Sequence, residues 1–222
     1  FPLPKHSLDT SYQLLENEHA RCYIRTPNTQ FRPACCDALH LDFWLNDENI
    51  LLGTGNYSYN CEPILQAYFT SVSSHNTVQF DQNEQMPKLS RFLYNQWIDS
   101  EISKKSETNN HLLSAQYKNA LGHQHNRALN LSENTLLVTD EFKGIKESAT
   151  LRWHLPNKNW QLNDNKIKAD QFIIEISADV PIKQIALVDG YQSRYYLKKE
   201  KIPVIEVTLT QSGTITTLLS WS

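Results

Sequence analysis

Apolar and polar residues alternate in many short runs of this chain, and this period fixes the class of its secondary structure. The clearest run covers residues 39–45, where Leu and Phe take the odd positions and His40, Asp42 and Trp44 the even ones. Successive side chains of a strand point to opposite faces, so the run predicts a strand with one buried face. Similar runs cover residues 136–142, 172–176, 204–209 and 215–219.

Clusters rich in Asn and Asp separate these runs, at residues 46–49, 157–159 and 163–165. Such residues satisfy turn backbones locally, and short strands at this spacing are typical of sandwiches. We therefore expect an all-β fold, a large antiparallel β-sandwich of the supersandwich kind with little helix. The sequence favours one domain over residues 1–222, in which residues 1–20 are a lead-in segment. Weak helical patterns predict short helices at residues 7–18 and 63–69.

Charge and composition exclude several classes of function. The net charge is -3, from 21 basic and 24 acidic residues, so no broad positive field would gather a nucleic acid, and an acidic glycan would need a local basic patch. No stretch approaches the roughly 20 apolar residues that cross a bilayer. Four cysteines could form two disulfides but are too few to frame a fold, which leaves the redox compartment open. The chain starts without Met or a signal sequence, so we expect it to be a fragment of a longer protein.

Three stretches carry a family resemblance. The first is Arg-Pro-Ala-Cys-Cys-Asp-Ala-Leu-His-Leu-Asp-Phe-Trp at residues 32–44, continued by residues 53–60. The second is Tyr-Phe-Thr-Ser-Val-Ser-Ser-His-Asn-Thr-Val at residues 68–78, followed by residues 80–81 and 85–92, and the third, weaker one covers residues 153–156 and 190–196. In order and spacing they resemble heparinase II/III-like proteins, found among bacterial polysaccharide lyases and in exopolysaccharide gene clusters.

This resemblance implies a β-sandwich that follows an (α/α) toroid, and the toroid is not in this sequence. It also implies β-elimination on a uronate-containing glycan, in which a base removes the C5 proton and an acid assists departure of the C4 oxygen. We therefore expect the C-terminal domain of a lyase-like protein of bacterial exopolysaccharide or capsule metabolism, periplasmic or secreted. Its partners would be an acidic polysaccharide and the missing toroid, and this chain alone would be inactive. The alternative is a non-catalytic glycan-binding or assembly module.

The resemblance further implies a metal site made of His, Asp and His. The first His falls at Cys35 or Cys36, and the favoured alignment places it at Cys36. Gly53 stands at the Asp and His75 at the second His. A thiolate can replace imidazole as a zinc ligand, but glycine offers no ligand atom. We therefore expect zinc or another divalent cation at Cys36 and His75 to be held weakly or not at all.

The candidate catalytic residues are His75, Tyr57 and Tyr59. Both tyrosines lie in a predicted loop after Gly55, and a tyrosine can stack on a sugar ring while its hydroxyl moves a proton. Core packing is the other explanation for the tyrosines, and hydrogen bonding to a turn is the other explanation for His75.

Candidate substrate-binding residues are His40, Asp42, Asn76 and Arg91. For His40 and Asp42 a buried, internally hydrogen-bonded pair is the alternative. The alternating residues His123, His125 and Arg127 could form a cationic row, for which an exposed, solvated strand face is the favoured interpretation, whereas Trp153 and His154 are expected in the core at a strand end.

Overall fold

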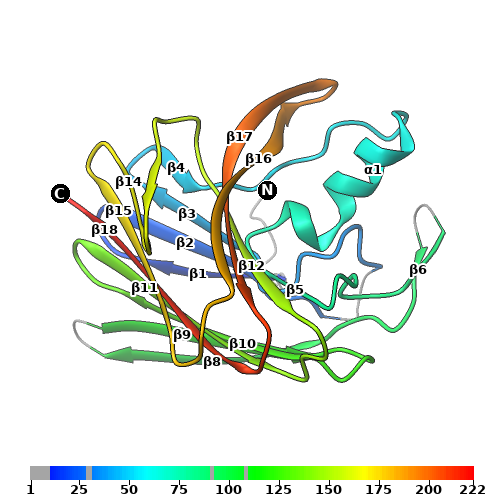
Figure 1. The fold of residues 1–222 in the computed structure, drawn as a ribbon, viewed down its shortest axis with the longest axis horizontal. Coiled ribbons are helices and arrows are strands. Elements are labelled where there is room, and N and C mark those ends of the chain that lie inside the picture. Colours follow the sequence, from blue (N-terminus) through cyan, green and yellow to red (C-terminus); the bar gives the residue numbers. More distant parts are fainter. Residues whose placement is uncertain (1–10, 29–31, 91–92, 108–109) are drawn as a thin grey trace, which may run out of the picture.

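The computed structural model describes residues 11–28, 32–90, 93–107 and 110–222, which are built almost wholly from antiparallel strands (Figure 1). The expected antiparallel β-sandwich with little helix is confirmed. One layer is an eight-stranded sheet with the order β13-β14-β15-β18-β11-β10-β9-β8. Its strands are Gln161–Asn163 (β13), Lys166–Ala169 (β14), Phe172–Ala178 (β15), Gly213–Trp221 (β18), Thr135–Lys143 (β11), Gln124–Leu131 (β10), Asn110–Lys118 (β9) and Ser100–Glu107 (β8).

The opposite layer contains two four-stranded sheets, with the orders β1-β2-β3-β4 and β16-β17-β12-β5. The backbone N–H of Leu52, just after β4, donates to the carbonyl of His154 at the end of β12 (2.8 Å), so the two sheets meet there. Their strands are Tyr12–Glu16 (β1), Ala20–Arg25 (β2), Leu41–Leu45 (β3), Glu48–Leu51 (β4), Gln184–Tyr195 (β16), Lys198–Leu209 (β17), Ala149–His154 (β12) and Val78–Phe80 (β5).

Large side chains hold the two layers together. Phe43 of β3 packs on Trp221 of β18, with ring centroids 5.3 Å apart. Trp153 of β12 donates its indole N–H to the Thr217 hydroxyl of β18 (3.2 Å). Both contacts join one of the four-stranded sheets to the eight-stranded sheet, and Trp153 is fully buried, as its sequence position predicted.

The period-two runs became strands, and one predicted helix did not form. The runs at 136–142, 172–176, 204–209 and 215–219 lie within β11, β15, β17 and β18. Of the expected helix at residues 7–18, the described part contains strand β1, so that prediction was wrong. Leu15 is buried from this strand, and all five of its residues pair with β2, so tertiary pairing overrides a weak helical preference.

Irregular structure gathers at one end of the sandwich, where Figure 1 shows helix α1. The predicted helix at residues 63–69 is confirmed as α1 (Pro63–Thr70), and a 3-10 turn η1 (Val72–Ser74) follows it. The small hairpin of β6 (Lys88–Ser90) and β7 (Leu93–Tyr94) lies at the same end. Among the described residues, no helix is both long enough and apolar enough to span a membrane.

Candidate functional site

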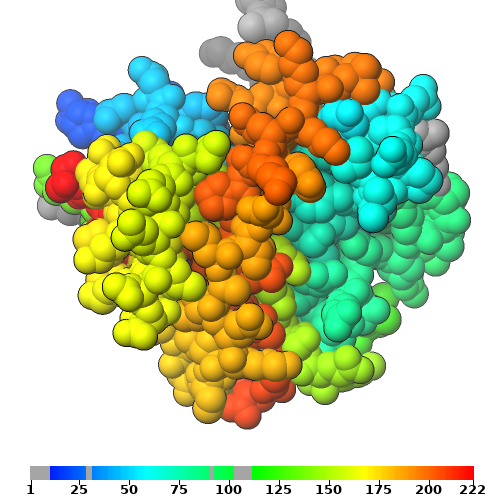
Figure 2. Space-filling model, turned by 45° about the horizontal axis from the view of Figure 1, so that its top comes forward, coloured from blue at the N-terminus to red at the C-terminus, as the bar shows by residue number. Residues whose placement is uncertain are grey.

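A pocket of about 320 Å³ lies at this end of the molecule, where three loops meet the C-terminal part of α1. The loop at residues 55–59 is held from outside by the β16-β17 hairpin, since Leu197 N–H donates to the Tyr57 carbonyl and the Ser58 and Tyr196 hydroxyls lie 3.1 Å apart. Figure 2 shows this hairpin (orange) against the segment around α1 (cyan). The residues that line the pocket are Arg32, Pro33, Ala34, Cys35, Gly55, Asn56, Ser58, Tyr59, Gln66, Phe69, Thr70 and His75.

His75 follows η1 and lies at the wall of this pocket with 8% of its surface exposed. Its Nδ1 is 2.8 Å from the carbonyl oxygen of Ser71, which can only accept a hydrogen bond, so Nδ1 carries the proton and Nε2 has the free lone pair. Burial and the neighbouring His40 lower the pKa of His75 from 6.5 to about 4. The ring is therefore neutral at physiological pH, a state that suits a metal ligand better than a general base.

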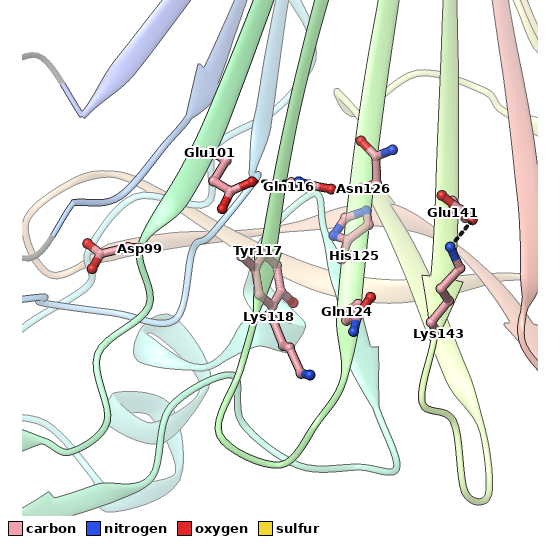
Figure 3. A pocket seen from close by; sticks show the side chains of 10 residues that line it. All are labelled: Asp99, Glu101, Gln116, Tyr117, Lys118, Gln124, His125, Asn126, Glu141 and Lys143. Carbon is pink, nitrogen blue, oxygen red and sulfur yellow. Dashed lines mark hydrogen bonds and ion pairs between the residues drawn. The ribbon is translucent and has the colours of Figure 1, made fainter.

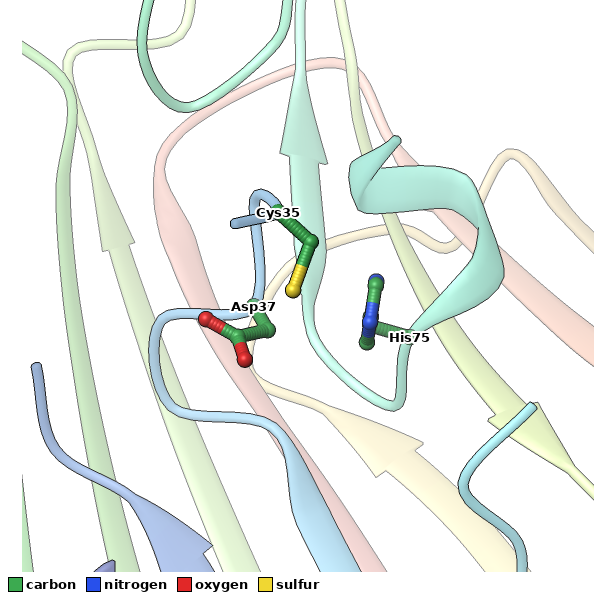
Figure 4. Close-up of side chains that lie close together, drawn as sticks. All are labelled: Cys35, Asp37 and His75. Carbon is green, nitrogen blue, oxygen red and sulfur yellow. The ribbon is translucent and has the colours of Figure 1, made fainter. Parts of the chain in front are cut away.

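Cys35 and Asp37 approach His75 from the loop that precedes β3 (Figure 4). One ligand atom of each residue lies within 4.8 Å of the other two, and this is the one such group of three among the described residues. Arg25 Nε donates to Oδ2 of Asp37 (3.2 Å). Cys36 lies elsewhere: its thiol is buried and faces the carbonyl of Met86 at 4.0 Å. The structure thus brings Cys35, and not the expected Cys36, to His75.

Thiolate, carboxylate and neutral imidazole are all zinc ligands, so this donor set fits the divalent cation that the resemblance implies. Its third donor is Asp37, because Gly53 lies beside His40 and Asp42 instead. A β-carbon at position 53 would stand 3.2 Å from Asp42 Oδ2 and 3.6 Å from His40 Nε2.

The structure gives His40 and Asp42 different hydrogen-bond partners. His40 is 6% exposed, and its Nδ1 accepts a hydrogen bond from the backbone N–H of Asn76 (2.8 Å). Its Nε2 is 3.9 Å from Asp42 Oδ2, too far for a hydrogen bond. The Asp42 carboxylate instead accepts from the Asn49 amide (2.7 Å). His40 is therefore buried and is not hydrogen-bonded to Asp42. Its ring instead accepts a hydrogen bond from the backbone N–H of Asn76.

Asn76 was expected to contact substrate, but it is fully buried and its amide is used inside the protein. The amide nitrogen donates to the carbonyls of Leu41 (2.8 Å) and Leu52 (3.0 Å). The amide oxygen accepts from the backbone N–H of His154 (2.7 Å) and lies 2.9 Å from its Nδ1. Asn76 thus connects β3, the end of β4 and β12 behind the pocket. Arg91, the fourth substrate-binding candidate, lies outside the described residues.

The two tyrosine candidates have different positions. Tyr59 is 59% exposed and lines the pocket. Tyr57 is half-buried: its ring stacks on Phe69 at 5.9 Å between centroids, and the Lys199 ammonium lies 5.5 Å above it. Tyr57 is not among the residues that line the pocket. Core packing, one of the two alternatives for these residues, therefore describes Tyr57, while Tyr59 is exposed at the pocket.

A buried charge network supports the pocket loops, and the sequence interpretation placed it on the wrong face. His123 directly precedes β10, and His125 and Arg127 lie within it; all three point inward and are at most 1% exposed. Arg127 pairs with buried Asp140 (Nε to Oδ1, 2.7 Å), and its Nη1 donates to the carbonyls of Leu39 and Asn76, each at 2.6 Å. The sequence did contain a sign of this buried pair. Asp140 alternates in step with the apolar residues of the run at 136–142, which places it on the buried face of that strand.

A second concavity, of about 260 Å³, lies on β8 to β11 of the eight-stranded sheet (Figure 3). Glu101, Gln116, Asn126 and Glu141 occupy directly paired positions across these four strands. These polar side chains bond to one another or to a neighbour. The Gln116 amide donates to Glu101 (2.7 Å), and Lys143 forms an ion pair with Glu141 (2.6 Å). This surface has the features of a solvated sheet face.

The fold and the pocket define the class of this chain: a two-layer antiparallel sandwich with a polar pocket and a Cys, Asp and His cluster at one end. The family model described as "Heparinase II/III-like, C-terminal" matches residues 4–212. The chain belongs to this family, as its sequence motifs predicted.

Solved structures agree with this assignment. The chain is similar to the "Heparinase III-BT4657 gene product" with a TM-score of 0.77 and 16% identity, over 90% of this chain and 32% of that one. It is also similar to a mutant of the heparan sulfate lyase HepC from Pedobacter heparinus, with a TM-score of 0.72 and 14% identity, over 91% and 33% of the two chains. The chain therefore spans about a third of these structures, and identities this low show a shared fold. A comparison with curated proteins finds no match.

Proposed function

We propose that this chain forms one wall of the glycan groove of a polysaccharide lyase that acts by β-elimination on a uronate-containing glycan. The pocket beside His75 is the observation that carries the proposal. It combines a cation (Arg32), an exposed phenol (Tyr59) and two amides (Asn56 and Gln66) within about 320 Å³. Such convergent polar groups in a concave site are typical of ligand binding.

Arg32 and Tyr59 each have a part in the proposed chemistry. The guanidinium of Arg32 would pair with a uronate carboxylate through two parallel hydrogen bonds. The carboxylate must be neutralised before the C5 proton can leave, so this pairing would lower the barrier as well as bind the sugar. Tyr59 would stack on a sugar ring, and its hydroxyl would carry the proton, because the lowered pKa of His75 makes that ring a weak base.

The second candidate function is a glycan-binding or assembly module without catalysis. It uses the same pocket, whose polar lining can bind an acidic sugar whether or not a reaction follows. For either function the proposed ligand is an acidic exopolysaccharide or capsule, and the proposed location is the bacterial periplasm or the cell exterior. Turnover separates the two functions, since only a lyase produces unsaturated uronates.

Calorimetric titration of the chain with heparan sulfate and alginate oligosaccharides tests the proposal. We expect Arg32→Ala and Tyr59→Ala each to raise the Kd about tenfold, which corresponds to a loss of about 1.4 kcal/mol of binding free energy. Matched controls are Arg21→Ala and Tyr195→Ala, since both residues are exposed and neither lines the pocket. Binding that all four variants leave unchanged would reject the pocket as the glycan site.

A further inference from the structure

The hairpin of β16 and β17 extends beyond the sheet to which it belongs. Strand β12 pairs with residues 204–209 of β17, so residues 189–203 form a ribbon of two strands that pair with each other and not with β12. Figure 1 shows this ribbon (orange) projecting past the other strands. Its Ser193 N–H donates to the Thr54 carbonyl (2.7 Å), at the start of the loop that lines the pocket. The ribbon therefore has a fixed position beside the pocket.

The end of this ribbon is basic. Residues 194–199 contain three cations and no acidic residue, although the whole chain has a net charge of -3. The three cations, here called the hairpin cations, are Arg194, Lys198 and Lys199, and all of them are exposed. Within the described part of the chain none of them forms an ion pair, whereas Lys201 of the same hairpin pairs with Asp189 (2.9 Å). The hairpin end is thus a local basic patch, the feature that an acidic glycan requires on a chain with this net charge.

One of the hairpin cations is held in place by aromatic rings. The Lys199 ammonium lies 5.5 Å from the ring centroid of Tyr57 and 5.1 Å from that of Tyr191. The faces of the two rings attract the ammonium on one side, while the side chain remains exposed to solvent on the other. A charge that is already oriented loses less conformational entropy when it binds an anion.

The pocket and the hairpin cations lie on the two sides of one loop. Ser58 lines the pocket, and its hydroxyl is 3.1 Å from that of Tyr196, which lies between Arg194 and Lys198 in the sequence. The pocket contains a cation of its own, Arg32. Since every sugar of a polyuronate carries a negative charge, successive sugars of one chain match cations on both sides of this loop.

We propose that the hairpin cations are a second contact site for long acidic glycans, which place one part of the chain in the pocket and another part on the hairpin. This inference rests on the proposed function, because the pocket must hold one sugar for the hairpin to bind sugars further along. Two linked contacts bind more tightly than one, so affinity rises with glycan length. The second contact is electrostatic, so salt weakens it and the ring of Tyr195 is not required.

Calorimetric titration with an alginate trimer and an alginate dodecamer, at low and at physiological ionic strength, tests the inference. The hairpin variant combines Arg194→Gln, Lys198→Gln and Lys199→Gln. An exposed ion pair changes affinity about twofold, so we expect this variant to bind the dodecamer roughly eightfold more weakly, and with a smaller dependence on salt. It should bind the trimer as the wild type does. Tyr195→Ala, which keeps the three charges, should bind both lengths as the wild type does.

The matched control removes the same charge from exposed positions of the eight-stranded sheet, by Lys118→Gln, Lys143→Gln and Lys168→Gln. It should keep the affinity for both lengths, and circular dichroism checks the folding of every variant. Equal losses in the two triple variants would overturn the inference, since total charge alone would then explain them.

A folded hairpin variant that binds the dodecamer like the wild type, while Arg32→Ala weakens binding of both lengths, would also overturn the inference and would leave the proposed function standing. A wild-type chain that binds neither length would reject the proposed function and this inference with it.

Discussion

At the scale of single residues, Asn76 explains how a surface pocket is attached to the core. The residue after His75 is fully buried, and its side chain bonds to three separate strand ends or loops. Its backbone N–H also fixes the ring of His40. The position of His75 at the pocket is therefore set by the hydrogen bonds of its neighbour.

The first prediction follows from this role of Asn76. Asn76→Ala would leave the carbonyls of Leu41 and Leu52 and the N–H of His154 buried without partners, at about 1–3 kcal/mol each. We expect the free energy of unfolding to fall by about 3 kcal/mol or more, measured from urea denaturation midpoints. Asn159→Ala, at an exposed loop position, should change it by less than about 0.5 kcal/mol. Equal effects in the two variants would contradict the role of Asn76.

The buried histidines make a second prediction, about acid stability. Burial lowers the pKa of His75 from 6.5 to about 4 and lowers that of His154 well below its ordinary value. Between pH 6.5 and about 4 the unfolded chain therefore binds protons that the folded chain excludes, so stability is present above pH 6.5 and is lost as the pH falls. Each group contributes at most about 1.4 kcal/mol per pH unit.

The measurement is the free energy of unfolding as a function of pH for the metal-free chain. His75→Gln removes one titrating ring and should make the loss between pH 6.5 and pH 4 shallower than in the wild type. His19→Gln, which changes a histidine at an exposed position, serves as the control and should retain the wild-type slope. A steeper slope in His75→Gln would show that the sign is wrong.

At the scale of elements, strands β10 and β11 carry a buried ion pair, Arg127–Asp140, that links the two layers. Arg127 of β10 and Asp140 of β11 are both fully buried, and Arg127 lies over the ring of Trp153 in the opposite layer (4.8 Å). Burial opposes the charge of Asp140, but Arg127 and His125 hold its pKa below the ordinary value. The pair therefore stays ionised while it holds the loop carbonyls of Leu39 and Asn76.

The third prediction tests the Arg127–Asp140 ion pair. Arg127→Met would leave the Asp140 carboxylate buried without its cation, and breaking a buried pair on one side costs about 3–5 kcal/mol. Adding Asp140→Asn removes the stranded charge and should recover part of that loss. Urea denaturation of the two single variants and the double variant gives the coupling energy. Strictly additive losses would show that the two residues do not act as a pair.

At the scale of the whole molecule, the irregular segments that carry the site lie at one end of the sandwich. Two four-stranded sheets face the eight-stranded sheet, and the loops around the pocket gather where those smaller sheets meet. The matched structures are about three times as long as this chain, which covers 32–33% of them.

The fourth prediction is that this chain alone does not release unsaturated uronates from heparan sulfate, alginate or bacterial capsule. β-Elimination needs a base, an acid and a carboxylate-neutralising group held together, and one open wall loses both positioning and charge stabilisation. The measurement is ultraviolet absorbance of the conjugated product at high protein concentration. Turnover that is lost in Tyr59→Phe would instead place a complete active site on the sandwich.

The sequence by itself determined several of the strands, the short helix α1 and the family. A period of two allows only one way to bury a face, so residues 136–142 and 172–176 could be assigned to strands without their partners. Motifs survive in order along the chain, so the family could be identified from residues 32–92 before any contact was known. Tyr59 was chosen because polar residues in loops are available to ligands. His75 was chosen because it matches the second His of the metal site that the resemblance implies.

Tertiary structure alone decided which face and which neighbour each residue has. The parity of His123, His125 and Arg127 was readable, but whether that parity faces solvent depends on the opposite layer, which buries all three. Adjacent residues Cys35 and Cys36 are equivalent in the sequence, yet the loop directs the first to His75 and the second to Met86. Burial and pairing are set by segments far apart in the chain, here residues 35–40, 71–77 and 123–140, and no local pattern encodes their approach.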